Sequence, residues 1–216
     1  MADPTLQALP LFPLSRVLYP GALLPLRIFE VRYLDMIGRA HRDGTPFGVV
    51  SLTEGREVQQ PAGPTGDGYA NEIFHDVGTM ALVERLERPH PGLYQIVCRA
   101  TQRFRLQHRE RLKTGLWVGN AELLPDDTPL EVPEDLEPVA LMLRALLREL
   151  VKRAGDDMPI PQPHRLDDCG WVANRWCDLL PVPSDVKQRL LETDSPLLRL
   201  ELVSDLLEHI RRQPAA

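Results

Sequence analysis

Few side chains in this 216-residue sequence have the type and spacing that catalysis requires. Ser184 and Lys187 are close enough to form a nucleophile and its base. However, Ser184 follows a proline and precedes an apolar helical pattern, so we interpret it as the N-cap of a short helix. The sequence contains no Gly-Lys pair for a phosphate-binding loop, no Gly-x-Ser-x-Gly elbow and no His-Glu-x-x-His site. We therefore predict a protein that is not an enzyme and that needs no cofactor.

His164, Cys169 and Cys177 are the side chains most suited to binding a metal ion. Their spacing matches no established zinc pattern, and the two cysteines have the spacing of one helix face. We interpret them, together with Cys98 in an apolar stretch, as small buried thiols and predict no metal site. Three cysteines do not make a disulfide framework, and reduced thiols are typical of the cytoplasm.

A basic run lies in the middle of the sequence. It consists of Arg99, Arg103, Arg105, Arg109, Arg111 and Lys113, and only Glu110 interrupts its charge. One hypothesis is that the run contacts RNA, and the other is that it is a solvated strand face, paired with an acidic segment further along the chain. The net charge of −6 and the single interleaved aromatic residue, Phe104, favour the second interpretation. Nucleic acid is therefore a disfavoured partner.

Composition is that of an ordinary globular protein, with 43% hydrophobic and 26% charged residues. No apolar stretch approaches the roughly 18 residues that a membrane span requires. The first residues lack a basic segment followed by an apolar run, so we expect no signal peptide. These features predict a cytoplasmic protein without a membrane anchor.

Residues 1–124 have the pattern of a β-rich unit with one early helix. Apolar runs predict strands at 9–14, 23–29, 47–52, 79–86, 93–99 and 117–124, and alternation around Phe104 predicts one more. The runs at 79–86 and 93–99 flank a turn and form a hairpin. Helical spacing predicts a helix over 29–42 that stops at Gly44. The stretch 53–78 has no period, and a loop of this length is either functional or disordered.

Residues 138–216 have helical periodicity instead. An acidic, proline-rich segment at 125–137 precedes them, and we expect it to be an extended connector. Apolar faces predict about four helices, at 139–151, at 169–180, from Ser184 and from Ser195-Pro196. The predicted organisation is a β-rich unit at 1–124, a connector at 125–137 and a helical unit at 138–216.

Several motifs resemble the N-terminal domain of Lon proteases over nearly the whole chain. They are Leu9-Pro10-Leu11-Phe12-Pro13-Leu14, Tyr19-Pro20-Gly21, Pro25-Leu26-Arg27-Ile28-Phe29-Glu30, Arg32-Tyr33, Phe47-Gly48-Val49-Val50, Val77-Gly78-Thr79, Arg103-Phe104-Arg105-Leu106 and Lys187-Gln188-Arg189-Leu190-Leu191-Glu192. The resemblance implies an α+β fold, in which a PUA-like β-barrel with one early helix is followed by a helical subdomain. It also implies binding of unfolded or tagged protein segments, in cooperation with a separate protease or chaperone.

Such segments would lie in a groove between the β unit and the helices, held by apolar side chains. The groove candidates are Phe12, Tyr19, Phe29 and Tyr33, although each residue type is more often part of a core. Glu30, Arg32 and Tyr33 either line a ligand cleft or, as we favour, support the start of the helix and the core. Two alternatives stay open: RNA or small-ligand binding through the barrel, and an enzyme without a linear signature.

Overall fold

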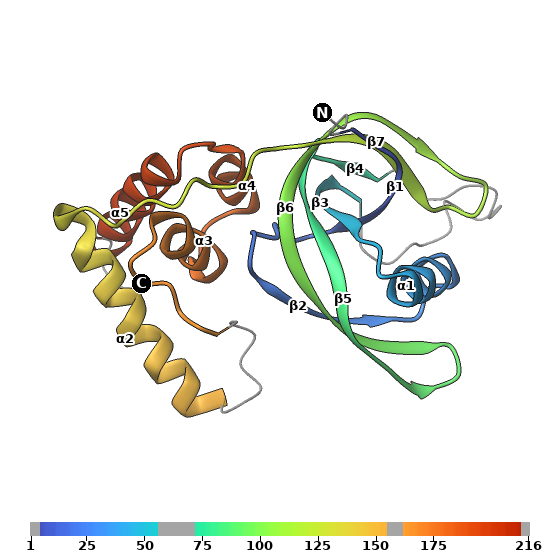
Figure 1. The fold of residues 1–216 in the computed structure, drawn as a ribbon, viewed down its shortest axis with the longest axis horizontal. Helices are drawn as coiled ribbons and strands as arrows, with labels where there is room; N and C mark the ends of the chain where they lie inside the picture. The colour runs from blue at the N-terminus through green and yellow to red at the C-terminus, as the bar shows by residue number, and fades with distance from the viewer. Residues whose placement is uncertain (1–4, 56–71, 155–161, 213–216) are drawn as a thin grey trace. The chain divides into compact units, whose positions relative to one another are not determined.

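The computed structural model describes residues 5–55, 72–154 and 162–212. The chain divides into two compact units, Met1–Pro125 and Asp126–Ala216, which are considered separately below (Figure 1). The first unit carries all the strands of the described residues and one helix, and the second is helical. The predicted fold class, an α+β barrel unit with an early helix followed by helices, is confirmed.

The first unit contains seven strands and helix α1 within its described residues. Their bounds are β1 (Thr5–Leu14), β2 (Leu23–Ile28), α1 (Val31–Asp43), β3 (Phe47–Glu54), β4 (Ile73–Phe74), β5 (Val77–His90), β6 (Leu93–Arg111) and β7 (Trp117–Leu123). Helix α1 ends as predicted at Gly44, whose left-handed φ of 63° suits a residue without a Cβ. Two predictions were wrong. The stretch around Phe104 is not a separate strand but the second half of β6, and the predicted loop at 53–78 includes β4.

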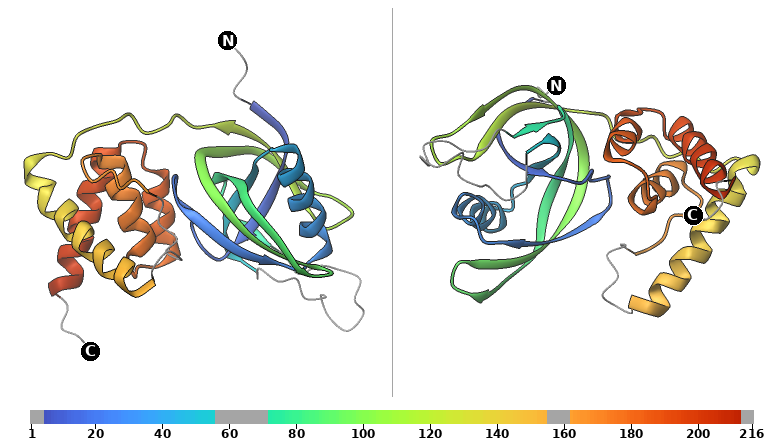
Figure 2. Two further views of the ribbon diagram at one scale, coloured as in Figure 1. Left: turned by 60° about the horizontal axis from the view of Figure 1, so that its bottom comes forward. Right: turned by 180° about the vertical axis from the view of Figure 1, so that it is seen from behind.

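Five of these strands close into a barrel. Their order is β1-β7-β6-β5-β3, and a parallel pairing of β3 with β1 completes the circle. Strand β6 is long enough to pair with two strands in succession: residues 94–99 pair with β2, and residues 104–111 pair with β7. The curved β5–β6 ribbon runs across the whole unit, as Figure 2 shows from two further sides.

Two hydrophobic clusters lie in the described part of the first unit. One fills the barrel around Phe104, Leu11 and Leu106, and the other lies between α1 and the strands. Close packing in the barrel depends on Gly78, where an added Cβ would stand 2.3 Å from the Val49 carbonyl oxygen. The glycine in the Val-Gly-Thr start of β5 is therefore a steric requirement of the barrel.

The second unit contains four helices within its described residues, as the sequence predicted. They are α2 (Glu137–Ala154), α3 (Cys169–Leu179), α4 (Ser184–Glu192) and α5 (Pro196–Arg212), with a short 3-10 turn at Glu134–Leu136. The predicted cap at Ser195 is confirmed, because its Oγ accepts from the Leu198 N–H at 3.2 Å. The predicted cap at Ser184 was wrong. Pro183 occupies the N-cap position of α4, no side chain caps this helix, and Ser184 is its first residue.

The acidic segment that follows the barrel is bound to the helices. Arg199 of α5 donates to both carboxylate oxygens of Asp127, at 2.6 and 3.0 Å. The Leu130 carbonyl accepts from the Cys169 N–H at 2.8 Å, and the Val132 N–H donates to the Asp167 carbonyl at 3.0 Å. Residues 127–132 are thus an ordered part of the helical unit. No helix in the described ranges is both long and apolar enough to cross a membrane.

Candidate functional site

Three of the four aromatic residues predicted to line a groove lie in the core of the β unit. The relative exposure of Phe12 is 6%, that of Tyr19 is 0% and that of Tyr33 is 2%. The rings of Phe12 and Tyr33 contact each other with centroids 4.1 Å apart and planes tilted by 35°. These side chains stabilise the fold and are not accessible to a ligand in the described structure. Phe29 differs, since 53% of it is exposed just before α1.

Glu30 and Arg32 form a polar cluster at the start of α1. Glu30 occupies the N-cap position without a side-chain cap hydrogen bond, and its carboxylate instead accepts from Arg32 Nε at 3.1 Å. Arg32 is 7% exposed and lies over the Tyr33 ring, 4.3 Å from its centroid. Glu30 therefore supports the helix start mainly through its partner Arg32.

The same arginine reaches two other parts of the unit. Its Nη2 donates to Glu72 Oε1 at 3.0 Å, and its Nη1 donates to the Gly115 carbonyl at 2.8 Å. Glu72 is itself buried and accepts from Trp117 Nε1 at 2.7 Å. The sequence pattern pointed to neither Glu72 nor Gly115, because both are more than 35 residues away from Arg32 along the chain.

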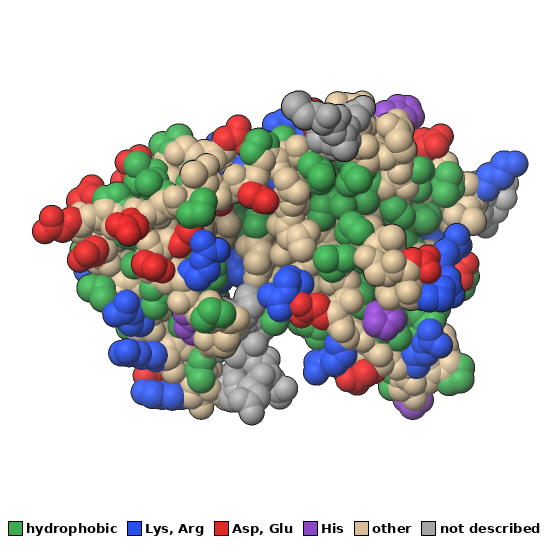
Figure 3. Space-filling view, in the orientation of Figure 1, with side chains coloured by type: hydrophobic (Ala, Val, Ile, Leu, Met, Phe, Trp, Pro, Cys, Tyr) green, Lys and Arg blue, Asp and Glu red, His purple; other side chains and the backbone are tan. Residues whose placement is uncertain are grey.

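Next to this cluster lies a cleft of about 820 Å³. One wall is the start of β1, a second is α1, and a third is the turn between β6 and β7. The residues that line the cleft are mostly apolar: Leu6, Gln7, Ala8, Leu9, Pro10, Val31, Arg32, Asp35, Met36, Arg39, Ala40, Thr45, Pro46, Met80, Leu112, Thr114 and Leu116. Figure 3 shows hydrophobic side chains gathered on the face of the β unit that is turned to the viewer.

Exposed apolar side chains surround the mouth of the cleft. Val31 is 77% exposed and Leu112 is 41% exposed, and both line it. The wall formed by β1 contains an irregularity between Leu6 and Leu9, where Ala8 has a φ of 51° and donates its N–H to Asn120 Oδ1. Left-handed backbone at a non-glycine residue is uncommon and tends to occur at ligand sites. The cleft therefore has the shape and chemistry of a site for an apolar ligand.

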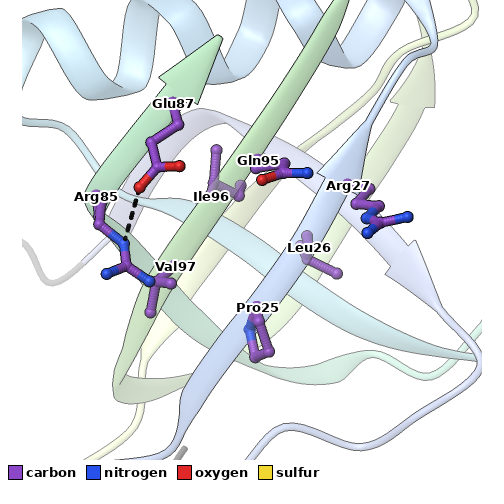
Figure 4. A pocket seen from close by; sticks show the side chains of 8 residues that line it. All are labelled: Pro25, Leu26, Arg27, Arg85, Glu87, Gln95, Ile96 and Val97. Carbon is purple, nitrogen blue, oxygen red and sulfur yellow. Dashed lines mark ion pairs between the residues drawn. The ribbon is translucent and has the colours of Figure 1, made fainter. Parts of the chain in front are cut away.

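A smaller groove of about 320 Å³ lies on the sheet formed by β2, β5 and β6 (Figure 4). Arg27 of β2 and Gln95 of β6 line it, and Arg85 and Glu87 of β5 form an ion pair at 3.6 Å along one side of it. These side chains are long and largely exposed, so the groove offers little enclosed apolar area. It is a weaker candidate than the cleft beside α1.

The basic run lies along β6 and is largely neutralised. Arg99 pairs with Glu84, Arg109 pairs with Asp76 at 3.1 Å, and Arg111 lies 3.7 Å from Glu72. The side chain of Arg103 is buried at 4% exposure, while that of Arg105 is exposed. A patch that binds phosphates needs several available cations, so this arrangement favours the interpretation as a strand face.

The residues with catalytic potential have structural roles. Lys187 Nζ donates to the Asp178 carbonyl oxygen at 3.0 Å. Cys98, Cys169 and Cys177 are buried free thiols, as predicted. Burial raises the pKa of Cys98 to about 12, which keeps this thiol protonated and unreactive.

Taken together, the chain is an α+β protein made of a small closed barrel with an apolar cleft, followed by a helical unit. The model of the ATP-dependent protease La (LON) substrate-binding domain matches residues 8–209, so the chain belongs to this family. The chain is 27% identical over 211 residues to a Lon protease of Anaeromyxobacter dehalogenans and 28% identical over 194 residues to one of Paraburkholderia phytofirmans. These matches cover 94% and 88% of the chain but only 23% of each relative's length.

Solved structures agree with this assignment. A crystal structure of a Lon N-terminal domain protein from Xanthomonas campestris has 29% sequence identity and a TM-score of 0.71, with 97% of this chain and 100% of that one covered. The N-terminal domain of a Mycobacterium avium complex Lon protease shares the fold at 17% identity and a TM-score of 0.60, with coverage of 94% and 98%. The resemblance predicted from the sequence motifs is thereby confirmed.

Proposed function

We propose that the chain is a non-catalytic module that binds unfolded or tagged segments of protein substrates in the cleft beside α1. The observation that carries this proposal is the exposed apolar lining of the cleft, in a chain that belongs to a substrate-binding family. A Val31 side chain that is 77% exposed contributes little to folding, and an apolar partner would gain by covering it. The apolar lining of the cleft and the exposure of Val31 both support a ligand that is itself apolar.

The polar groups of the cleft support binding rather than chemistry. Arg32 is held by its own partners, and Asp35 and Arg39 form an exposed pair at 3.7 Å on one helix face. Among the described residues that line the cleft there is no histidine, cysteine, serine or lysine. Affinity would come from burial of apolar side chains, and the polar rim would leave the bound backbone in contact with water.

In this proposal the bound segments come from unfolded or tagged proteins, and the module works beside a separate protease or chaperone. The name of the matching family supports the choice of protein substrates. The three buried free thiols support a cytoplasmic location, because reduced cysteines are usual there. The RNA alternative gains no support from the arginines of β6, since carboxylates neutralise three of them.

The proposal is tested by fluorescence anisotropy with labelled, carboxymethylated α-lactalbumin, a permanently unfolded protein, and with native α-lactalbumin for comparison. Val31→Asp should weaken binding of the unfolded form about tenfold, since full burial of a valine side chain is worth about 1.5 kcal/mol. Leu141→Asp is the matched control, because Leu141 is 53% exposed on α2 in the other unit. Equal binding by wild type and Val31→Asp would contradict the proposal, as would a lack of preference for the unfolded form.

A further inference from the structure

Two of the three walls of the cleft, α1 and the β6–β7 turn, are joined by one buried side chain. Arg32 belongs to α1, and through Nη1 it binds the carbonyl of Gly115 in the β6–β7 turn, 83 residues away, at 2.8 Å. Its Nε and Nη2 bind Glu30 at 3.1 Å and Glu72 at 3.0 Å. Every nitrogen of the guanidinium group therefore has a partner, and the side chain is only 4% exposed.

Glu72 links Arg32 to the two strands that flank the turn. Its side chain is 2% exposed and accepts from Trp117 Nε1, at the first residue of β7, at 2.7 Å. Arg111, at the last residue of β6, lies 3.7 Å from the same carboxylate. Glu72 thus binds both strands that flank the turn, and Arg32 binds the turn itself. The distance between α1 and the turn is set by charged hydrogen bonds of fixed geometry.

We propose that Arg32 is a positioning residue, which fixes the width of the cleft between α1 and the β6–β7 turn. Val31 and Met36 line the cleft from α1, and Leu112 and Leu116 line it from the turn, so the position of Arg32 determines how far apart these apolar groups stand. A cleft held open in this way is preformed, and an incoming apolar segment does not have to order it. This inference rests on the proposed function for its effect on binding, but not for its effect on the width.

Lysine is the informative replacement at this position. It keeps the positive charge and most of the stem, but it has one ammonium group in place of the planar fork that binds three partners at once. Arg32→Lys should therefore retain the fold and lose the fixed width. Glu72→Gln is the second variant, because it removes the charge of the other partner with almost no change of shape.

The width is measured by electron–electron double resonance between spin labels at Arg42→Cys on α1 and Lys113→Cys in the turn. The three native cysteines are buried and should not be labelled. We expect a clearly broader distance distribution in Arg32→Lys and Glu72→Gln, together with binding of carboxymethylated α-lactalbumin about tenfold weaker, the loss expected when charged hydrogen bonds no longer order a site. Arg199→Lys, which changes another buried arginine in the helical unit, should alter neither quantity.

The outcomes separate this inference from the proposed function. An unchanged distance distribution in both folded variants overturns it, and so does a broader distribution with unchanged affinity. If wild type fails to bind the unfolded probe while Val31→Asp behaves identically, the proposed function fails. The distance measurement then still decides whether Arg32 sets the width.

Discussion

Replacement of Asp127 by alanine should selectively destabilise the helical unit. Asp127 accepts two of the five hydrogen bonds that Arg199 donates, and the other three go to Asn174 and to the carbonyls of Leu190 and Thr193. Only 1% of the Arg199 side chain is exposed. Without Asp127, its guanidinium group keeps its charge but loses the only carboxylate that these contacts provide.

The size of the effect follows from this geometry. Removal of one partner from a buried ion pair costs about 3–5 kcal/mol, because the remaining charge stays desolvated. The Asp127 side chain is 17% exposed, so water can enter the space that alanine leaves. We therefore expect the lower end of that range, about 3 kcal/mol, and a fall of about 15 °C in the Tm of a unit of this size.

Urea unfolding followed by far-ultraviolet circular dichroism measures this change, because the signal comes mainly from α2 to α5. Asp185→Ala is the matched control. It removes a carboxylate from an ion pair at 3.2 Å with Arg189, but both side chains are about 70% exposed, so the loss should be below about 0.5 kcal/mol. If Asp127→Ala costs no more than Asp185→Ala, the Arg199 cluster does not hold residues 127–132 to the helices as we have argued.

Two further predictions concern the β unit. Gly78→Ala should lower the free energy of unfolding, measured in urea, by about 3 kcal/mol, because the new Cβ would stand 2.3 Å from a backbone oxygen. Gly38→Ala in α1 is the control: the nearest neighbour of its Cβ is 3.6 Å away, so this change should raise the free energy of unfolding by about 0.7 kcal/mol. Equal effects of the two substitutions would refute the steric argument. The raised pKa of Cys98, about 12, means that the unfolded chain loses this proton at lower pH than the folded chain. The free energy of unfolding should therefore fall as pH rises above the ordinary cysteine value, by up to about 1.4 kcal/mol per pH unit, and Cys98→Ala should show a smaller fall between about pH 8 and pH 10.

Local patterns in the sequence were sufficient to predict most elements of the fold. Strand β3 and helices α2 to α5 follow from apolar periodicity, and the end of α1 follows from Gly44. The errors arose where tertiary structure decides the outcome. Strand β6 continues through residues 100–103 because β5 pairs with it there, Ala81 with Ala100 and Thr79 with Arg103, and β4 is a two-residue strand that exists only by pairing with β3. Neither pairing strand can be recognised from the residues next to β6 or β4 in the sequence.

The buried polar clusters were beyond prediction for a related reason. Arg32 and Arg199 look like ordinary surface residues of amphipathic helices, and their partners Glu72 and Asp127 lie 40 and 72 positions away. Charged residues are rarely buried unless they are paired, and pairs so distant in sequence carry no periodic signal. The basic run lies mainly on β6, but Arg99, Arg109 and Arg111 pair with Glu84, Asp76 and Glu72 and not with the acidic segment at 125–137, as the sequence had suggested.

The candidate site shows why core and surface aromatic residues were confused. The helical spacing that predicted this helix selects Phe29, Tyr33, Ile37 and Ala40; the structure buries the last three, whereas Phe29, which precedes α1, is 53% exposed. The same spacing leaves out Val31, and 77% of this residue is exposed. A periodic apolar face identifies residues that are buried in the hydrophobic core. A surface that binds apolar partners therefore consists of apolar residues outside that face. Exposed apolar area that a partner could cover therefore lies at Val31 and at Leu112 in the facing turn, and not at the buried Phe12 and Tyr33.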